Sequence, residues 1–374
     1  MQKVKVGIIG CGGISKLKHF PALKKASDRV ELVACCDIIE DRATQAAAQY
    51  GTSATKTYVD YRKMLEDKSI EVVYVLTPNN SHCALTVDSL DAGKHVLCEK
   101  PMAATTVDAR KMMDAVKRSG KKLTIGYQNR FRKDVQIMYK AAQAGELGEI
   151  YYAEAQAIRR KGVPTWGVFP DKSKQGGGPL IDLATHALDI ALWAMGNYKP
   201  KMVLGSVFQK MKDNFEGNLF GPWDPKTYEV EDSAFGFLKM ENGATINLNA
   251  SWALNVRKNR EGQVTLVGTK AGVELVGEGA GAPTAPVNGT GRAIFNTARF
   301  GELIDMAPME ISGPGPADFG GDPWRVGDAE CKAWLDAIVN DTEPVVKPEQ
   351  AFVVTQILDA VYKSAEDGKA IEFC

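Results

Sequence analysis

A strand, a glycine turn and a helix open the chain, and this unit restricts the fold more than any other stretch of the sequence. Residues 4–9 form an apolar strand, residues 10–15 follow as Gly-Cys-Gly-Gly-Ile-Ser, and residues 16–25 favour a helix in which Pro21 introduces a bend. In a dinucleotide-binding fold the first glycine permits the turn, the second lets a pyrophosphate approach the backbone, and the helix N-terminus supplies amide donors. Ser15 replaces the usual third small residue and still allows close helix packing. A glycine turn with a purely structural role is the alternative.

An acidic residue ends the second strand. Residues 31–36 form this strand, and Asp37 follows it, 22 residues beyond Ser15. An acidic side chain at this position binds the ribose hydroxyls and repels a 2′-phosphate, so NAD is favoured over NADP. Ile38 stands where a phosphate-binding site would carry Arg or Ser, whereas Arg42 leaves NADP use open. The alternative role of Asp37 is that of N-cap to a following helix.

The alternation of strand and helix continues to residue 126. The predicted elements are a helix at 40–50, a helix near 58–66, a strand at 71–76, a helix at 83–92, a strand at 95–98, a helix at 107–119 and a strand at 122–126. Four strand–helix units predict a doubly wound parallel sheet, that is, a Rossmann domain over residues 1–125.

Two loops of this domain follow strand ends, where open α/β sheets bind ligands. Residues 77–82 (TPNNSH) offer hydroxyl and amide groups to a cofactor, and His82 is expected to orient this loop rather than to catalyse. In the second loop Pro101 stops the strand and allows a cis bond after Lys100, which leaves Glu99 and Lys100 at the strand's carboxyl end. A surface turn with a solvated charge pair is the alternative.

The pattern changes after Gly126. A helix is expected at 134–144, and period-two strands at 150–158 and 244–252 predict antiparallel or mixed pairing. The Gly- and Pro-rich tract 277–323 lacks sustained periodicity, which predicts long loops covering the sheet or a neighbour. A second α/β domain is therefore expected over residues 126–374, with a C-terminal helix at about 350–366.

A glycine run introduces a helix that carries two chemically active side chains. Pro179 follows three glycines and suits the first helical turn. Asp182 and His186 are four residues apart and therefore share one helix face. A capped helix with a structural histidine is the alternative.

Composition and charge exclude several functions. Forty-six basic residues balance forty-six acidic ones, so no net field attracts nucleic acid or an anionic membrane. The apolar run 187–195 is too short to span a bilayer, and no export signal is visible, so a cytoplasmic protein is expected. Seven cysteines without CxxC spacing suit reduced thiols, and four scattered histidines suggest no metal site.

Five motifs in sequence resemble those of the Gfo/Idh/MocA oxidoreductase family. They are GxGxx(small), TPNxxH, GKHVLCEKP, GYQNRF and GGGPLIDLATHALD. The resemblance implies a Rossmann domain followed by an α/β domain with a large open mixed sheet, NAD as cofactor, a small sugar, glycoside or polyol as substrate, and a homodimer or homotetramer. Residues 159–167 (RRKGVPTWG) look like the loop of a subgroup that includes levoglucosan dehydrogenase and glycoside 3-dehydrogenases.

The resemblance assigns catalysis to Lys100, Asp182 and His186. In alcohol oxidation a hydride moves to nicotinamide and the hydroxyl proton moves to a base. A free lysine has a pKa of about 10.4 and a free histidine about 6.5, so His186 is the expected proton acceptor. Lys100 then donates to the reacting oxygen, and Asp182 orients the substrate. The roles of Lys100 and His186 stay interchangeable, because desolvation beside the nicotinamide would lower a lysine pKa.

The resemblance also implies two sets of binding residues. Those expected to bind the cofactor are Gly10, Cys11, Gly12, Gly13, Ile14, Asp37, Ile38, Arg42, Thr77, Pro78, Asn79, His82, Glu99, Lys100, Gln128 and Trp166. Those expected to bind the substrate are Lys100, Asn129, Arg159, Trp166, Asp182, His186 and Tyr362, with a core tyrosine as the alternative role of the last.

The predicted activity is NAD-dependent oxidation of a ring secondary hydroxyl, C3 of a glucoside, to a 3-keto sugar or glycoside. An inositol dehydrogenase is the alternative within the family. An NAD-using glycosidase, which oxidises and then eliminates the aglycone, would release no net NADH. A redox-silent NAD(P)H-binding regulator would tolerate the loss of Lys100 and His186. The exact substrate, the direction and the oligomeric state are left open by the sequence.

Overall fold

The structure is a computed structural model that describes residues 3–277, 292–307 and 325–373. The chain divides into two compact units, one of residues 1–128 with 324–352 and the other of residues 129–323 with 353–374. The domains expected from the sequence, 1–125 and 126–374, did not include this return of a late segment to the first unit. Within the described residues, no helix has the length and apolar character needed to cross a membrane.

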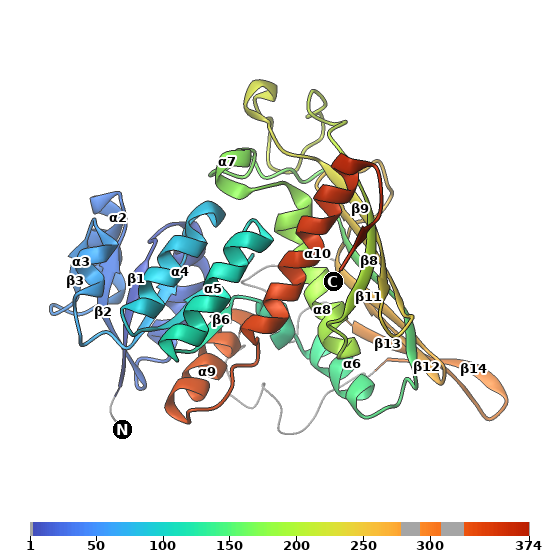
Figure 1. Cartoon of the computed structure of the whole chain (residues 1–374), viewed down its shortest axis with the longest axis horizontal. Helices are drawn as coiled ribbons and strands as arrows, with labels where there is room; N and C mark the ends of the chain where they lie inside the picture. The colour runs from blue at the N-terminus through green and yellow to red at the C-terminus, as the bar shows by residue number, and fades with distance from the viewer. Residues whose placement is uncertain (1–2, 278–291, 308–324, 374) are drawn as a thin grey trace. The chain divides into compact units, whose positions relative to one another are not determined.

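The first unit is built on a six-stranded parallel sheet (Figure 1). Its strands are β1 (Val4–Ile9), β2 (Val30–Cys36), β3 (Lys56–Tyr58), β4 (Val72–Val75), β5 (His95–Cys98) and β6 (Leu123–Ile125). Their spatial order is β3-β2-β1-β4-β5-β6, and every pairing is parallel. This is the strand order of dinucleotide-binding folds, in which ligands bind at the carboxyl ends of β1 and β4, where the order reverses. The predicted Rossmann fold is confirmed.

Helices join these strands in the predicted sequence. They are the π-helical turn η1 (Ser15–His19), α1 (Phe20–Lys25), α2 (Glu40–Tyr50), α3 (Tyr61–Leu65), the 3-10 turn η2 (Asn79–Ser81), α4 (His82–Asp91), α5 (Thr106–Ser119) and α9 (Val326–Val339). The expected helix at 16–25 is therefore a π turn followed by an α-helix, with Pro21 in the first turn of α1.

Apolar packing explains why α9 belongs to the first unit. Cys331, Trp334 and Leu335 of α9 join the buried cluster that contains Val6 of β1 and Phe20 of α1. Burying such side chains provides the main stabilisation of a core. A segment more than 300 residues from the first strand thus completes its helix layer.

The second unit is built on a nine-stranded mixed sheet. Its strands are β7 (Ile150–Ile158), β8 (Pro200–Phe208), β9 (Ser233–Met240), β10 (Thr245–Ser251), β11 (Arg260–Gly268), β12 (Ala271–Val276), β13 (Arg292–Arg299), β14 (Glu302–Met306) and β15 (Ile371–Glu372). The order is β14-β13-β12-β11-β7-β10-β9-β8-β15. Strands β7 and β10 pair in parallel and the other neighbours pair antiparallel, which confirms the expected mixed sheet.

The expectation of long loops over residues 277–323 was wrong where the structure describes that tract. Residues 292–306 form the antiparallel hairpin β13–β14, paired to the edge of the sheet through β12. Most side chains of this hairpin are at least partly exposed, so no apolar alternation marks the strands in the sequence. The rest of the predicted loop, residues 278–291 and 308–323, lies outside the described residues.

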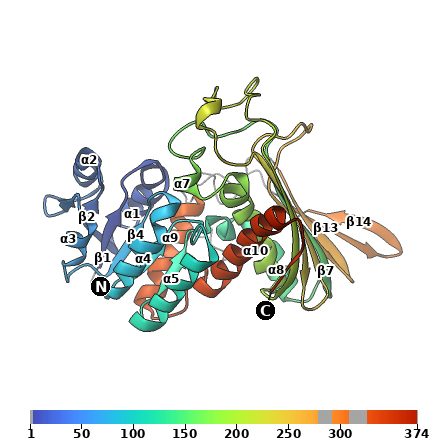
Figure 2. The ribbon, with the colours of Figure 1, turned by 45° about the horizontal axis from the view of Figure 1, so that its top comes forward.

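Helices cover one face of the nine-stranded sheet (Figures 1 and 2). The helical elements are η3 (Gln128–Phe131), α6 (Lys133–Gln143), α7 (Lys172–Gln175), the π turn η4 (Leu180–Ala184), α8 (Thr185–Met195), η5 (Pro225–Thr227) and α10 (Pro348–Asp367). Helix α8 packs against β7 and β11, and α6 packs against α8. Glycine at 205 lets α10 approach β8 closely, because an added Cβ would lie 2.6 Å from the carbonyl oxygen of Val361.

Candidate active site

The glycine turn after β1 is shaped for close backbone approach. Gly10 has a φ of 97°, and an added Cβ would lie 2.5 Å from the carbonyl oxygen of Leu76, so only glycine fits this position. By contrast, a Cβ added at Gly12 or Gly13 would meet no described atom within 4 Å. The protein's own packing therefore does not require glycine at those two positions. Open space over exposed backbone is what a bound pyrophosphate needs, so the turn fits a dinucleotide.

Asp37 holds the glycine turn against the end of β2. Its Oδ2 accepts a hydrogen bond of 2.8 Å from the backbone N–H of Cys11, and its Oδ1 accepts one of 2.9 Å from Ile39 N–H. Helix α2 begins at Glu40 with no side-chain cap, so the alternative role of Asp37 as its N-cap is not observed. Two further residues expected to bind the cofactor, Ile38 and Arg42, are exposed beside it. The carboxylate thus stands at the carboxyl edge of the sheet, where a ribose is expected.

His82 links the two loops that the sequence analysis placed at this edge. Its Nδ1 lies 2.8 Å from the carbonyl oxygen of Pro101 and its Nε2 lies 2.9 Å from that of Thr77. The ring is fully buried, and burial lowers its pKa, so it is neutral at pH 7 and donates to one carbonyl at a time. The Lys100–Pro101 peptide bond is cis, as the sequence allowed. This geometry is consistent with the predicted role of His82 in orienting the loop.

Three charged side chains, Lys18, Glu99 and Glu330, form a buried ionic cluster under the glycine turn's helix. Lys18 Nζ lies 2.8 Å from Glu99 Oε1 and 2.7 Å from Glu330 Oε2, and the Lys18 side chain has no exposed surface. Glu330 Oε1 is buried and has no hydrogen-bond partner within the described part of the chain. The sequence analysis identified Glu99 but neither partner, because they lie 81 residues before it and 231 after it without any periodic relation.

The cluster reaches the expected catalytic lysine through its backbone. Glu99 Oε2 accepts a hydrogen bond of 3.1 Å from the N–H of Lys100, while Glu99 Oε1 lies 2.8 Å from His19 Nε2. Gln128 Oε1 accepts from Lys18 Nζ at 3.1 Å, which ties a further predicted cofactor residue to the same group. A Cβ on Gly126 would lie 3.0 Å from Glu99 Oε1. The position of Lys100 therefore depends on a carboxylate that is packed and bonded on several sides.

Burial sets the charge states in this cluster. It raises the pKa of Glu330 to about 7, against the attraction of Lys18. Burial opposes the charges of Lys18 and Glu99 as well, but the carboxylates raise the pKa of Lys18, while Lys18 and His19 hold that of Glu99 well below its usual range. Burial and the neighbouring Lys18 lower the pKa of His19 to about 4, so it is neutral. Lys18 and Glu99 are thus ionised at pH 7, and Glu330 exchanges its proton near that pH.

In the second unit, one helix carries Asp182 and His186. The predicted regular helix begins instead as the π turn η4, which contains Asp182, and continues as α8, in whose first turn His186 is 9% exposed. Asp182 Oδ2 accepts a hydrogen bond of 3.0 Å from Nε1 of the buried Trp252. The next acidic residue of the helix, Asp189, pairs with Arg130 in the interior. Asp182 and His186 are therefore the polar groups of this helix that remain available for chemistry.

Glu231 anchors the start of this helix and was not identified from the sequence. Its Oε2 accepts from Gly178 N–H at 2.8 Å, and its Oε1 accepts from Leu180 N–H at 3.2 Å and from the Tyr362 hydroxyl at 2.7 Å. A Cβ at Gly177 would overlap the Tyr362 hydroxyl, 2.0 Å away, which explains one glycine of the run. Burial raises the pKa of Tyr362 well above its usual value. Its hydroxyl thus has a structural partner, as the core-tyrosine alternative requires.

Replacing Glu231 with alanine should lower the unfolding free energy by about 3 kcal/mol, because two backbone donors and the Tyr362 hydroxyl lose their buried acceptor. Denaturant unfolding of the purified protein measures this loss. The matched control is Glu229→Ala, which removes an exposed carboxylate two residues away and should change stability by less than about 0.5 kcal/mol. Equal effects of the two replacements would show that Glu231 does not anchor the helix.

The other expected substrate residues have different surroundings. Arg159 forms a two-pronged ion pair with Glu261, with N–O distances of 2.7 and 2.8 Å. Trp166 is 51% exposed. Asn129 is buried, and both polar atoms of its side chain have no hydrogen-bond partner among the described residues. A buried amide in this state is the kind of group that a bound ligand or water satisfies.

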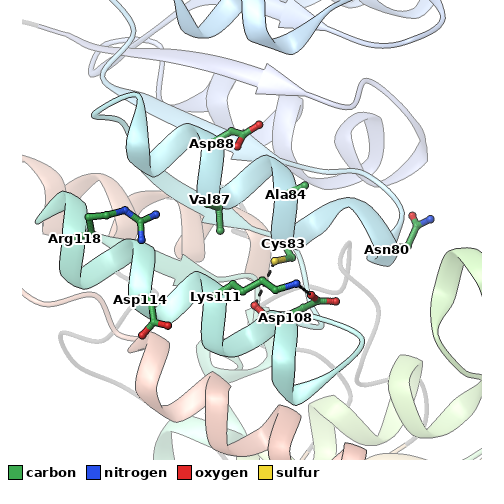
Figure 3. Close-up of a pocket in the computed structure, with 9 residues that line it drawn as sticks. All are labelled: Asn80, Cys83, Ala84, Val87, Asp88, Asp108, Lys111, Asp114 and Arg118. Atoms are coloured by element: carbon green, nitrogen blue, oxygen red, sulfur yellow. Dashed lines mark hydrogen bonds and ion pairs between the residues drawn. The ribbon is translucent and has the colours of Figure 1, made fainter.

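A surface hollow between α4 and α5 contains none of the expected catalytic residues (Figure 3). Cys83 Sγ donates to the carbonyl oxygen of Asp108 at 3.4 Å, and Lys111 pairs with the Asp108 carboxylate at 2.8 Å. Burial raises the pKa of Cys83 to about 11, so its thiol is protonated at neutral pH and a weak nucleophile. In the described part of the chain, no group of three or more His, Cys, Asp or Glu side chains is arranged to hold a metal ion.

Comparison with known proteins gives matches along almost the whole chain. A family model described as "Oxidoreductase family, NAD-binding Rossmann fold" matches residues 4–127, and one described as "Oxidoreductase family, C-terminal alpha/beta domain" matches residues 140–373. D-glucoside 3-dehydrogenase of Escherichia coli K12 is 36% identical over 99% of this chain and 97% of its own length. Inositol 2-dehydrogenase of Salmonella typhimurium is 31% identical over 52% of this chain and 56% of its own length.

Solved structures agree with these matches at the level of the fold. Levoglucosan dehydrogenase in complex with NADH and levoglucosan has a TM-score of 0.81 to this chain, covers 99% of both chains and is 21% identical. An identity this low shows a shared fold.

Proposed function

The chain belongs to the Gfo/Idh/MocA oxidoreductase family, and on that premise we propose that it oxidises the C3 hydroxyl of a D-glucoside and transfers the hydride to NAD. The observation that carries this proposal is the match to a D-glucoside 3-dehydrogenase at 36% identity along 97% of that protein's length. The match to an inositol 2-dehydrogenase covers about half of each chain, 52% and 56%, and so supports inositol oxidation less.

NAD is the proposed cofactor because of the groups at the edge of the parallel sheet. The open backbone at Gly12 and Gly13 suits a pyrophosphate, and the Asp37 carboxylate would accept hydrogen bonds from the ribose hydroxyls. The same negative charge would repel the 2′-phosphate of NADP. When bound, the nicotinamide supplies the hydride acceptor, and the protein supplies binding, orientation and proton transfer.

Three side chains carry the proposed proton chemistry. His186 takes the proton of the substrate hydroxyl, and Lys100 donates a hydrogen bond to the reacting oxygen and stabilises its developing negative charge. Asp182 orients the sugar by accepting a hydrogen bond from a neighbouring hydroxyl. The bond from Trp252 leaves the second oxygen of Asp182 for that purpose. Glu99 fixes the backbone of Lys100, so it acts as a positioning residue.

Replacing Asp37 with serine should shift the ratio of kcat/KM for NADP to that for NAD by at least about tenfold in favour of NADP, since the charge that excludes a 2′-phosphate is lost. Steady-state kinetics with both cofactors and one saturating substrate measure the ratio. The control is Asp41→Asn, which neutralises an exposed carboxylate in the first turn of α2. Wild-type preference for NADP would contradict the role given to Asp37.

Substrate screening tests the proposed activity. Methyl D-glucosides of both anomers, glucose and myo-inositol are each incubated with NAD, and NADH is followed by its absorbance. The proposal expects NADH formation with a methyl glucoside and a 3-keto product. A stronger response to inositol would support the inositol dehydrogenase instead. Methanol release without NADH accumulation would identify a glycosidase, and no reaction with any substrate would favour the regulator.

A further inference from the structure

Two surface loops of the second unit, residues 159–170 and 209–232, are joined by a dense set of hydrogen bonds. Asn218 accepts from Val163 N–H at 2.9 Å and donates to the carbonyl oxygens of Val163 and Gly221 at 3.0 and 2.8 Å. The N–H of Leu219 donates to the carbonyl oxygen of Lys161 at 3.2 Å. Bonds of this number hold a loop in one conformation, so the side chains it presents are pre-organised.

These loops present three aromatic rings, Trp166, Phe169 and Phe220, which we call the aromatic platform. The ring of Trp166 contacts Phe220 edge to face at a centroid distance of 4.7 Å and Phe169 at 5.7 Å. Trp166 is 51% exposed and Phe220 is 37% exposed. Fixed aromatic surface left in water is unfavourable by itself and gains free energy when a ligand covers it.

The aromatic platform is connected to the expected substrate site by direct packing. Phe169 lies 6.2 Å, centroid to centroid, from Trp252, and Trp252 Nε1 donates to Asp182. Two ring-to-ring contacts therefore separate the exposed face of Trp166 from the carboxylate proposed to hold the sugar. All these residues belong to one compact unit, so their separation is a property of that unit alone.

We infer that the aromatic platform is an aglycone subsite, which binds a ring-shaped aglycone of the glycoside while Asp182 binds the glycone. This inference rests on the proposed function. An aryl group or the apolar face of a second sugar ring stacks on Trp and Phe faces, and both lose unfavourable contact with water. Glucose and inositol carry no aglycone and gain nothing from this surface. The platform would thus determine specificity for glycosides over free sugars and cyclitols.

Kinetics with matched substrates test the subsite. For the wild type and for Phe220→Ala and Trp166→Ala, kcat/KM is measured with phenyl and methyl D-glucosides. Wild-type enzyme should prefer the phenyl glucoside, and each replacement should reduce the ratio of phenyl to methyl kcat/KM about tenfold, mainly through KM. Leu219→Ala, which truncates a 75% exposed side chain of the same loop, should leave the ratio unchanged. Trp166→Phe, which keeps a ring, should retain most of the preference.

The two proposals fail in different ways. A wild-type enzyme that oxidises methyl glucosides without any preference for phenyl glucosides would overturn the aglycone subsite and leave the proposed function intact. The same conclusion follows if the replacements lower activity on both glucosides equally. Oxidation of inositol but of neither glucoside would overturn the proposed function itself, and the subsite with it.

Discussion

Lys100→Met should lower kcat about 1,000-fold, the loss expected when a group that hydrogen-bonds a developing alkoxide is removed. Methionine keeps much of the length and apolar volume of the side chain and removes its charge and donors. The backbone N–H of residue 100 still bonds to Glu99, so the local structure should persist. Steady-state kinetics with the preferred glucoside measure kcat, and fluorescence titration with NADH measures whether the cofactor still binds.

Two further replacements sharpen this prediction. Lys100→Arg keeps the positive charge and should retain more activity than Lys100→Met if the lysine stabilises charge rather than accepting the proton. Lys68→Met, at an exposed position of the same unit, should behave as the wild type. Activity of Lys100→Met within tenfold of the wild type would rule out the catalytic role and would favour the regulator.

Lys18→Met should lower the unfolding free energy by about 3–5 kcal/mol, the cost of leaving buried charge without its partner. Lys18 has no exposed side-chain surface, and its ammonium lies within 2.8 Å of two carboxylates. Removing it leaves Glu99 and Glu330 in the interior with mutual repulsion. Denaturant unfolding measures the loss, and Lys24→Met, an exposed lysine on the neighbouring helix, provides the control. A loss below about 1 kcal/mol would show that the cluster contributes little.

Glu330→Gln isolates one member of the same cluster through pH. Burial raises the pKa of Glu330 in the folded protein from 4.5 to about 7, so its stabilising contribution is complete below pH 4.5 and lost as the pH rises through 7. Glutamine does not titrate. The stability of Glu330→Gln relative to wild type should therefore increase between pH 5 and 8, by roughly 3 kcal/mol at most. In Lys18→Met, adding Glu330→Gln should restore part of the lost stability at pH 8. A pH-independent difference would contradict the assigned charge states.

Local sequence patterns predicted most of the first unit. Apolar strands followed by glycine turns and amphipathic helices specify the parallel sheet, because each element there has a buried face that must match its own period. The three-residue strand β3 was missed, since its side chains are exposed or half-buried and carry no such pattern. The π turn at 15–19 was missed as well, because its residues are ordinary helix formers.

The candidate site could be predicted only in part, for a physical reason. Residues that follow strands or share a helix face, such as Asp37, Lys100, Asp182 and His186, are placed by local geometry. Glu231, Trp252 and Glu330 act through contacts between segments distant in sequence, and a single acidic or aromatic residue gives no signal of its partner. The same holds for α9, whose apolar face specifies burial but not the unit that it joins.

The proposed activity is tested most directly with a methyl D-glucoside that carries deuterium at C3. After incubation with NAD, mass spectrometry of the dinucleotide shows whether deuterium has reached the nicotinamide ring. The proposed function predicts deuterated NADH together with a 3-keto glucoside, and neither product in Lys100→Met. Unlabelled NADH would place the oxidation at another carbon, and the absence of NADH with any glucoside would contradict glucoside oxidation altogether.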